Sequence, residues 1–408
     1  MPLFFDTIHG NINIDKNDLK FIDNRWLKRL KRVKQLGLLD HVFPSGSHTR
    51  FEHVVGVYHL AERYTTLLEN NSDKKLFTDK EKRCVKLAAL FHDLGHGPYS
   101  HVFDHFLENF DNTNLVKTHE ERSQLIVEEI FRETQPSDFN GYDIDMIKTM
   151  IEPPPHMIVN SNGMLTYNCE KPYLYEMVNN KLNGIDIDRF DYLQRDSKHI
   201  GLDYAFNPER IFYKSFVKDK RILYDVSLKN NIFDLFYTRY RFHKDIYNHK
   251  TVKMIELMIS DALLTVNNCE NCSIEDKFVD ICSLGDDNRI KEDYLYLDDS
   301  IYTKFLSKKS DCLNRKKSTN LIQRIEERNL YKLKYYGKYS ENLLEKYPNC
   351  DMVKIKFTLS SFKNNILENT LFHNKFTDKI EFGEVNNRLI PDNCEEEITM
   401  IYDKNITT

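Results

Sequence analysis

Apolar residues recur at helical spacing through most of the first 285 residues, and this periodicity restricts the fold more than any other feature. One stripe contains Trp26, Leu30 and Val33, with Asp23 as the expected N-cap, and another amphipathic pattern runs from residue 230 to 267. Apolar positions three and four residues apart fall on one helix face, so each stripe predicts a helix packed on a core. We expect a mainly α fold, with further helices over about 50–69 and 79–93.

The pattern changes beyond residue 285. Residues 306–320 are polar and predict an exposed loop. Apolar and polar residues alternate over 352–359, and 380–385 and 397–402 are shorter candidates of the same kind. Alternation with a period of two is typical of strands. The sequence therefore predicts a helical domain over residues 1–285 and a smaller α+β C-terminal lobe over residues 286–408.

Composition and charge exclude several classes of protein. Of the 408 residues, 40% are hydrophobic and 30% are charged, as in globular proteins. No run approaches the roughly 18 apolar residues that span a bilayer, and the start lacks the basic and apolar regions of a secretory signal. We expect an intracellular protein, cytoplasmic or nuclear, with no membrane partner. The net charge of -5 argues against nucleic-acid binding through bulk charge, although a local patch can still bind anions.

The eight cysteines do not form a dense disulfide framework in a chain of this length. Cys269 and Cys272 form one CxxC pair, with no second CxxC pair to complete a zinc site. We interpret this pair mainly as chance spacing, with structural zinc as the alternative.

Four residues of ligand type point to a metal site. His92 and Asp93 follow an apolar run and precede the break at residues 95–98, which places them at a helix end. His53 falls on the helix expected from residue 50, and Asp188 falls on another. Two imidazoles and two carboxylates suit Mn, Fe, Zn or Ni. A cation of this kind acidifies water and polarises phosphate oxygens, so the donor set points to phosphoester hydrolysis.

Further polar residues have spacings that favour catalysis or binding. His101 and Asp104 are three residues apart, where a carboxylate can orient an imidazole and keep it protonated, as a general acid requires. Residues four apart lie along one helix face. Two such stripes are Asp188, Tyr192 and Asp196, on a helix capped by Asp186, and Arg239, His243 and Tyr247. A solvated face would explain the charges of either stripe by itself.

Taken in order, SHTRFEH at Ser47, HDLGHGPYSH at His92, THEERS at Thr118 and NGIDIDRFDYLQRD at Asn183 resemble the motifs of the HD-domain phosphohydrolases. They are most similar to the animal deoxynucleoside triphosphate triphosphohydrolases that combine a sterile alpha motif with an HD domain. The similarity runs from IHG at Ile8 almost to the C-terminus, and an ordered set of this kind is far more specific than a bare HD dipeptide. The resemblance makes residues 1–285 the HD catalytic domain. Because the chain starts at the IHG motif, we expect no sterile-alpha-motif domain.

The resemblance implies hydrolysis of dNTPs to deoxynucleoside and inorganic triphosphate, by attack of metal-bound water on the α-phosphorus. It makes His53, His92, Asp93 and Asp188 the ligands of Fe, Mn or Zn, with Mg²⁺ on the triphosphate. We favour His101, backed by Asp104, as the acid that protonates the leaving 5′-oxygen, with His119 as the other candidate. His96 is expected to contact the α-phosphate or the nucleophile.

The resemblance also implies where the substrate lies. Three arginines would bind the phosphates: Arg50, Arg189 and Arg239. The family usually has Lys at the position of Arg189. Four residues would select the deoxyribose: Gln35, Leu36, Tyr192 and Asp196. Leu36 would leave no room for a 2′-hydroxyl. His243 and Tyr247 complete the substrate contacts, and we expect several dNTPs to be accepted.

Members of this family are activated by GTP and dNTPs bound between subunits, so we expect a homodimer or homotetramer. The matching allosteric positions are Asp23, Val42, Phe43, His249, Lys250, Arg328 and Lys332. Lys28 and Lys31, however, replace a Gln and an Arg used for guanine recognition, and residues 225–227 lack two basic residues. The basic run over 25–34 is equally well explained as the solvated face of a helix. We expect activation by GTP to be weak, altered or absent.

Two alternatives remain open. The chain could be another HD phosphohydrolase that acts on nucleoside monophosphates, guanosine tetraphosphate or cyclic nucleotides, although the three arginines and Leu36 argue against this. It could also be a non-catalytic HD scaffold that binds nucleotides or RNA. A scaffold is expected to have lost a metal ligand or the acid, and the sequence keeps all of them.

Overall fold

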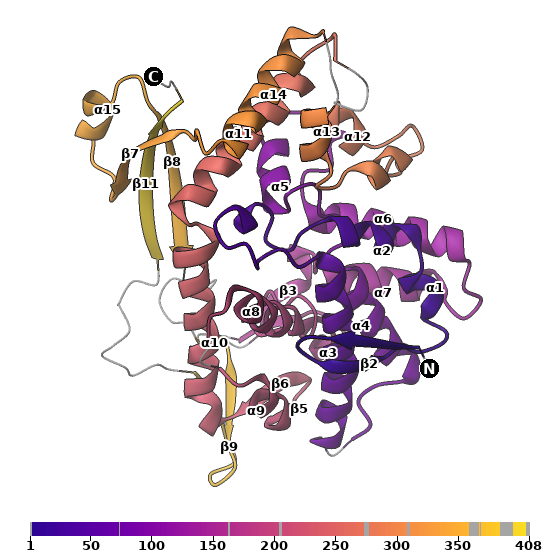
Figure 1. Cartoon of the computed structure of the whole chain (residues 1–408). Coiled ribbons are helices and arrows are strands. Elements are labelled where there is room, and N and C mark those ends of the chain that lie inside the picture. The colour runs from indigo at the N-terminus through magenta and orange to yellow at the C-terminus, as the bar shows by residue number, and fades with distance from the viewer. Residues whose placement is uncertain are drawn as a thin grey trace.

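The computed structural model of the chain describes residues 2–72, 74–161, 164–203, 206–272, 277–307, 311–358, 367, 369–383 and 395–404. Helices dominate the fold, which confirms the mainly α architecture expected from the periodicity (Figure 1). In chain order they are α1 (Leu19–Ile22), α2 (Arg25–Arg29), α3 (Arg50–Asn70), α4 (Asp79–Phe91), α5 (His101–Leu107), α6 (His119–Thr134), α7 (Gly141–Ile151), α8 (Ile187–Ile200), α9 (Pro208–Tyr213), α10 (Lys229–Arg241), α11 (Lys250–Asn267), α12 (Phe278–Cys282), α13 (Ile301–Ser307), α14 (Leu313–Glu326) and α15 (Asn342–Lys346).

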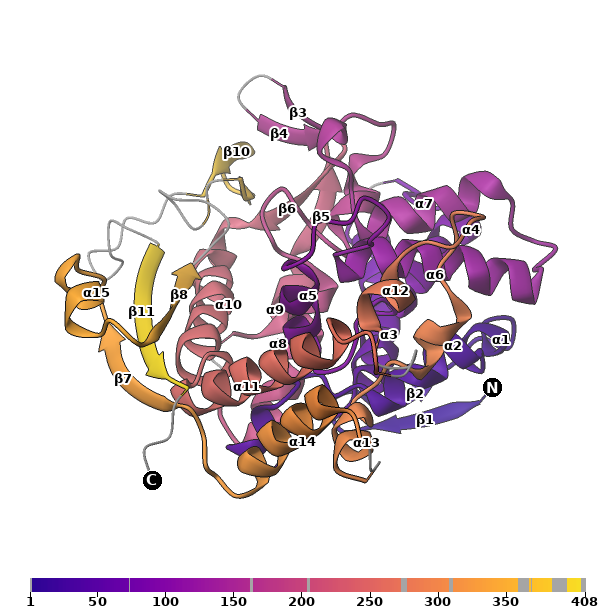
Figure 2. The same cartoon turned by 90° about the horizontal axis from the view of Figure 1, so that it is seen from above.

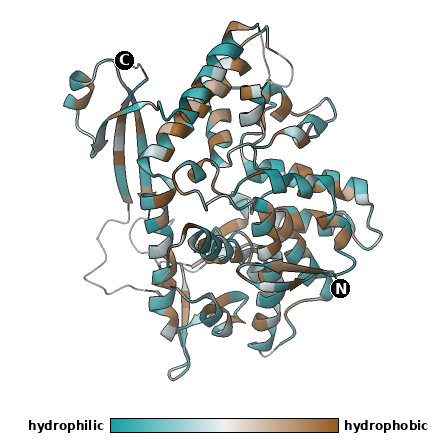
Figure 3. Cartoon of the chain, in the orientation of Figure 1, coloured by the Kyte–Doolittle hydropathy of each residue, from teal (hydrophilic) through white to brown (hydrophobic). Residues whose placement is uncertain are grey.

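The hydrophobic core lies between α3, α4, α6, α7 and α8. Helix α3 packs against α4 and α8, and α7 packs against α4 and α6. Hydrophobic and hydrophilic residues alternate along most helices in Figure 3, the pattern of amphipathic helices that bury one face. The starts of α3 and α4 are fixed locally, because Glu52 accepts from the Thr49 amide at 3.1 Å and Thr78 and Glu81 exchange two such bonds.

The described residues also form four small sheets. Two are antiparallel hairpins, β1 (Leu3–Asp6) with β2 (Gly10–Asn13) and β3 (Ile158–Ser161) with β4 (Met164–Tyr167). The third has the order β10-β9-β6-β5, made of β5 (Ser215–Lys218), β6 (Arg221–Asp225), β9 (Leu371–Asn374) and β10 (Lys379–Phe382). The fourth, β7-β11-β8, is made of β7 (Lys332–Gly337), β8 (Asp351–Thr358) and β11 (Glu395–Asp403), and it lies beside α10 and α11 in both views (Figure 2).

The strands agree with the alternation near the C-terminus. Strands β8, β10 and β11 confirm the three segments, while residues 359, 384 and 385 of the expected strands lie outside the described residues. Strand β6 pairs in parallel with β9, so one sheet joins residues on both sides of position 285. The domain boundary at that position stays a prediction. None of the described helices is both long and apolar enough to cross a membrane.

The helix expected over 230–267 is interrupted. Helix α10 is followed by one π-helical turn, η6 (Phe242–Tyr247), and α11 starts afresh at Lys250 with His249 as its N-cap. The His249 ring accepts the Thr251 amide at 3.3 Å. A π turn adds a residue to the helical repeat and often lies at a functional site. Apolar periodicity continued through this break, and the sequence therefore did not reveal it.

Two other expectations were wrong. The stripe from Trp26 to Val33 forms two short pieces, α2 and the 3-10 turn η1 (Leu30–Arg32), instead of one helix. Asn24 rather than Asp23 caps α2 by accepting the Trp26 amide at 2.8 Å. The polar run over 306–320 contains the start of α14. Helix α14 buries only a narrow face on α11, where Ser318 donates to the Ala262 carbonyl at 2.8 Å, so its sequence looks like a loop.

Candidate metal and substrate site

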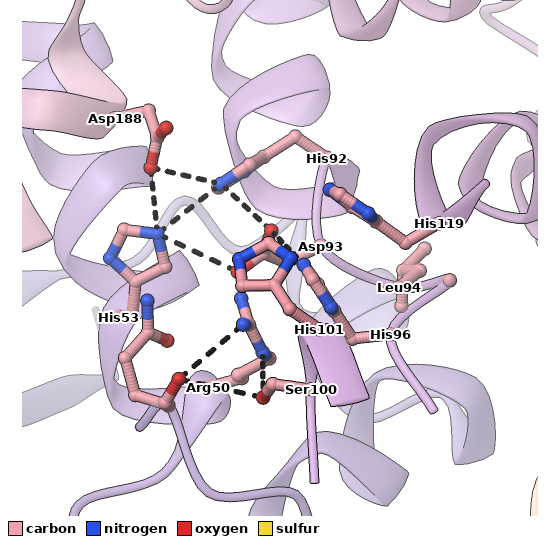
Figure 4. A network of polar contacts seen from close by, with 12 residues as sticks. Arg50, His53, His92, Asp93, Leu94, His96, Ser100, His101, His119 and Asp188 are labelled. Carbon is pink, nitrogen blue, oxygen red and sulfur yellow. Dashed lines mark hydrogen bonds and ion pairs between the residues drawn. The ribbon is translucent and has the colours of Figure 1, made fainter. Parts of the chain in front are cut away.

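Three helices of the core bring the four predicted ligands together. His53 lies in the first turn of α3, His92 is the C-cap of α4 with Asp93 next to it, and Asp188 lies in the first turn of α8. The cap of α8 is Asp186, as predicted, which accepts the Arg189 amide at 3.0 Å. Figure 4 shows the four side chains pointing toward one another.

The distances between the donors fit one divalent cation. His53 Nε2 lies 3.2 Å from His92 Nε2 and 3.0 Å from Asp188 Oδ1, and His92 Nε2 lies 3.4 Å from the same Asp188 oxygen. Asp93 Oδ1 lies 3.4 Å from His92 Nε2. Ligands about 2.1 Å from a metal are about 3.0–3.4 Å apart at octahedral or tetrahedral angles. His53, His92 and Asp188 therefore fit a metal as they stand, and Asp93 lies beside them as the fourth candidate ligand.

A further carboxylate, that of Asp191, holds His53 in place, and it was not predicted from the sequence. Asp191 Oδ2 lies 2.8 Å from His53 Nδ1, so the other ring nitrogen, Nε2, is directed at the ligand cluster. Asp191 is fully buried, and it also bonds Arg195 at 2.8 and 3.0 Å and His9 at 2.6 Å. Orientation of a ligand histidine by a carboxylate is a regular feature of metal sites.

Gly56 allows this arrangement. A Cβ at this position would stand 2.1 Å from Asp191 Oδ1 and 2.4 Å from an Arg195 nitrogen. The close neighbours are therefore side chains. The signal in the sequence was a glycine one turn after His53, combined with Asp191 and Arg195 four residues apart on α8.

The carboxylates around His53 favour a positive charge at its ring. Burial by itself disfavours the charged form of His53, but the contacts with Asp188 and Asp191 outweigh burial and raise the pKa of His53 to about 10. Burial also opposes charge on Asp93, yet Arg50 and the neighbouring histidines hold the pKa of Asp93 well below its usual range. A site that attracts a proton so strongly also attracts a cation.

Arg50 links the ligands to the cavity wall. Its guanidinium donates to Asp93 Oδ2, to Ser100 Oγ at 3.0 Å and to the Gln35 carbonyl at 3.4 Å, and its side chain is almost fully buried. These bonds fix the planar group at the edge of the cluster, where it faces the cavity (Figure 4). A fixed guanidinium is suited to bind an anion beside the metal.

A group of histidines flanks the cluster on the other side. The His96 and His119 rings stack at 3.8 Å, and His101 meets His96 edge-on at 5.0 Å. Asp104 bonds His119 Nδ1 at 2.8 Å and Arg122, whereas His101 Nδ1 is 3.9 Å from that carboxylate. The His101 side chain is 68% exposed and that of His119 is 19% exposed. Asp104 therefore holds His119 directly, and His101 projects further into open space.

One cavity of about 560 Å³ contains nearly all the predicted site residues. Every residue expected to contact the substrate lines it, together with His92, Asp93, Asp188, His96, His101 and His119. His53 and Asp104 lie behind its wall. Cavities of this size are typical of small-molecule sites.

The corner expected to hold the sugar is preorganised. Asp196 is held between His48 Nε2 at 2.8 Å and the Tyr247 hydroxyl at 2.5 Å, and the π turn after α10 presents that tyrosine. Gln35 lies here with Leu36, and its Oε1 atom is buried with no hydrogen-bond partner among the described residues. A buried carbonyl oxygen without a donor costs free energy, so this atom points to a ligand hydroxyl or amine.

The cationic side chains of the cavity outnumber those predicted. Arg189 donates to the Gly184 carbonyl at 2.8 Å and to Asp186, and Arg239 donates to the Thr358 carbonyl at 3.3 Å. Lys181 and Lys253 also line the cavity, each paired with a glutamate at 2.9 and 3.0 Å. The place of these lysines in the cavity was not predicted from the sequence, because neither belongs to a motif or a polar stripe.

None of the nine predicted allosteric residues lines this cavity. Lys28 forms an exposed ion pair with Asp23 at 3.0 Å, and the Lys31 ammonium lies 4.5 Å from the centre of the Phe51 ring. The Phe43 and His249 rings meet edge-on at 5.9 Å, and Arg328 donates to the His41 carbonyl. These residues therefore lie outside the cavity, and residues 41–43 contact both His249 and Arg328.

Comparison with known proteins identifies the family. A model of the HD domain matches residues 50–196. The chain is 34% identical over 348 residues to a putative HD domain-containing protein of Acanthamoeba polyphaga mimivirus, which covers 81% of this chain and 72% of that protein. It is 34% identical to the deoxynucleoside triphosphate triphosphohydrolase SAMHD1 of Bos taurus and 32% identical to a SAMHD1 homolog of Dictyostelium discoideum.

Those two alignments cover 81% and 80% of this chain and 58% and 59% of the relatives, so the chain spans less than two thirds of their length. The HD match begins at the first residue of α3 and ends at Asp196, and it contains all four candidate metal ligands. The chain therefore belongs to the HD-domain family and is a homologue of SAMHD1.

Proposed function

We propose that the protein hydrolyses dNTPs to deoxynucleoside and inorganic triphosphate with a divalent cation at His53, His92, Asp93 and Asp188. One observation supports this most directly: a single cavity joins the cation donors, several cationic side chains and a corner suited to a sugar. The cation, Fe, Mn or Zn by the donor set, would acidify a water and polarise a phosphate oxygen when bound, with Mg²⁺ accompanying the triphosphate.

The residues around the cluster have distinct roles in this proposal. Arg50 binds the phosphate nearest the cation, and Arg189 and Arg239 bind the remaining phosphates. His96 contacts the α-phosphate as a neutral ring, because burial, Arg50 and His119 hold the pKa of His96 well below its usual range. Gln35 and Asp196 bond the 3′-hydroxyl, and Leu36 excludes a 2′-hydroxyl.

His101 donates the proton to the leaving 5′-oxygen once the bound phosphates raise its pKa, which burial, His119 and Arg50 lower to about 3 in the free protein. Of the histidines beside the cluster it projects furthest into the cavity, and a proton donor must reach the leaving atom. His119, bonded to Asp104, lies behind it at a ring separation of 5.4 Å and stabilises phosphate charge.

The role of His101 can be tested with leaving groups of different basicity. Replacing His101 by Ala should slow dNTP cleavage by about 100- to 10,000-fold, because an alkoxide leaves poorly without a proton. Cleavage of bis(p-nitrophenyl) phosphate, whose nitrophenolate needs no proton, should slow far less. His119→Ala should slow both substrates alike. Equal losses for both substrates in His101→Ala would exclude it as the acid.

The phosphate clamp can be tested on α10. Arg239→Ala should raise KM for dNTPs by about 10- to 100-fold, the effect of losing a charge-assisted hydrogen bond. Arg241→Ala is the matched control, because Arg241 lies on the same helix with a 61% exposed side chain and does not line the cavity. Equal KM values for the two variants would contradict the clamp.

Identification of the products distinguishes the proposed reaction from the alternatives. Incubation of the purified protein with each dNTP and Mn²⁺ or Mg²⁺ should yield deoxynucleoside and triphosphate. Monophosphate or pyrophosphate products, or cleavage only of nucleoside monophosphates, guanosine tetraphosphate or cyclic nucleotides, would favour a different HD phosphohydrolase. Binding of nucleotide or RNA without turnover would favour a scaffold.

We also propose that GTP activates this protein little or not at all. Lys28 and Lys31, which replace residues expected to recognise guanine, are already engaged with Asp23 and Phe51. dNTP hydrolysis measured with and without GTP should therefore give similar rates. Strict dependence on GTP would contradict this. Sedimentation analysis in the same buffers tests the homodimer or homotetramer expected from the family.

A further inference from the structure

Three cysteines meet at a point remote from the HD cluster in sequence. Cys269 and Cys272 follow the C-terminal end of α11, and Cys312 is the N-cap of α14. Cys312 Sγ lies 3.4 Å from Cys269 Sγ and 3.4 Å from Cys272 Sγ. The CxxC pair that looked like chance spacing in the sequence thus gains a third thiol from 40 residues further along the chain.

The arrangement favours a metal over a disulfide. Cys312 is equidistant from both members of the pair, and three sulfurs cannot all be paired. A disulfide would require one separation to fall to about 2.05 Å. Zinc bonded to thiolates at about 2.3 Å needs sulfurs about 3.8 Å apart, so the two separations from Cys312 have to open by only about 0.4 Å.

The backbone around the three thiols is shaped to hold them. The Cys272 amide donates to the Cys269 carbonyl at 3.2 Å, which closes a tight turn and brings both sulfurs to one side. Lys277 Nζ bonds the Cys269 carbonyl at 2.6 Å and the Asn267 carbonyl at 3.1 Å, and so secures the turn to the end of α11. The spacing of two residues between the cysteines is the usual one for zinc ligands.

Cys312 is also favoured as a thiolate. Its side chain stands at the N-terminal end of α14, because Cys312 is the N-cap of that helix. Amides at the start of a helix stabilise negative charge on a sulfur placed there. The thiolate is the form that binds a metal.

We propose that Cys269, Cys272 and Cys312 bind one zinc ion as thiolates, with a water as the fourth ligand. Among the described residues no fourth His, Cys, Asp or Glu joins this group, so the proposal assigns three protein ligands to the ion. Binding displaces the remaining thiol protons to solvent, and no electron is transferred.

The zinc would clamp α11 to α14, which lie side by side in both views (Figures 1 and 2). Helix α11 also carries Lys253 and Glu256, which line the substrate cavity at its other end. The site is therefore structural. It does not depend on the function proposed for the HD cluster, and it does not share a ligand with it.

Cobalt separates the two metal sites. The full-length protein, purified under reducing conditions and loaded with Co²⁺, should show a near-ultraviolet thiolate-to-cobalt charge-transfer band, which nitrogen and oxygen ligands of the HD cluster do not give. The band should persist in Asp188→Ala and disappear in Cys312→Ser. Absence of the band from the wild-type protein would overturn the proposal, whatever the activity.

Zinc content gives a second measurement. Cys312→Ser should lose one zinc per chain relative to the wild type, whereas Cys350→Ser, which changes a free cysteine outside the group, should lose none. Should Cys312→Ser fail to fold, Cys272→His provides the test, because imidazole also binds zinc and the variant should keep the metal. Unchanged zinc in Cys312→Ser, loss of zinc from Cys272→His, or a disulfide between Cys312 and either partner in freshly purified protein would overturn the proposal.

Discussion

Replacement of Asp188 by Ala should lower dNTP turnover by at least about 1,000-fold, because the cation loses a ligand and several kcal/mol of transition-state stabilisation is lost with it. Asp188 Oδ1 lies 3.0 Å from His53 Nε2 and 3.4 Å from His92 Nε2, so the substitution removes one donor from the centre of the cluster. Steady-state rates at saturating substrate and the metal content at the HD cluster, measured together, test this expectation.

Lys198→Ala is a suitable control, since Lys198 is exposed on the same helix and does not line the cavity. It should retain full activity. An Asp188→Ala protein that binds its metal and turns over dNTPs at the wild-type rate would remove Asp188 from the ligand set and weaken the proposed chemistry.

Replacement of Asp191 by Asn should cost about 3–5 kcal/mol of folding free energy, the usual effect of breaking a buried ion pair. Asp191 and Arg195 are both fully buried, and the amide would leave the guanidinium with Asp6 at 2.8 Å as its remaining carboxylate. Burial opposes charge on Asp191, but Arg195, His53 and His9 outweigh it and hold the pKa of Asp191 well below its usual range. Urea denaturation followed by circular dichroism measures the loss.

The same substitution should weaken metal binding by about 10- to 100-fold, because the His53 ring loses the carboxylate that orients it. Glu209→Gln is the control for stability. It breaks the exposed Arg63–Glu209 pair at 2.7 and 2.6 Å and should cost at most about 1 kcal/mol. Equal stabilities of the two variants would show that Asp191 contributes little.

Much of the site could be predicted because its ligand residues belong to local sequence motifs. His53, His92, Asp93 and Asp188 each belong to a short segment of unusual composition, and periodicity placed each on a helix or at its end. The helix starts were also accessible, since Thr78 and Glu81 form a capping signal three residues apart.

Residues that act through tertiary contacts could not be predicted from the sequence in this way. In the sequence, Asp191 cannot be distinguished from other acidic residues on an amphipathic helix. Its role depends on Gly56, which has no side chain and so lets Asp191 lie beside His53. Cys312 is 40 residues from Cys272 and becomes a partner only when α14 packs on α11. The π turn before Tyr247 is hidden because apolar residues continue through it.

The parallel pairing of β6 with β9 has a consequence for synthesis of the protein. Tyr224 and Asp225 find their partners Phe372 and His373 only after roughly 150 further residues have been translated, which at usual ribosomal rates takes roughly 7 to 30 s. During that interval one edge of β6 keeps unpaired backbone groups, the kind of edge that recruits other chains. Between completion of its catalytic helices and emergence of β9, the nascent chain therefore exposes a strand edge that the finished protein covers.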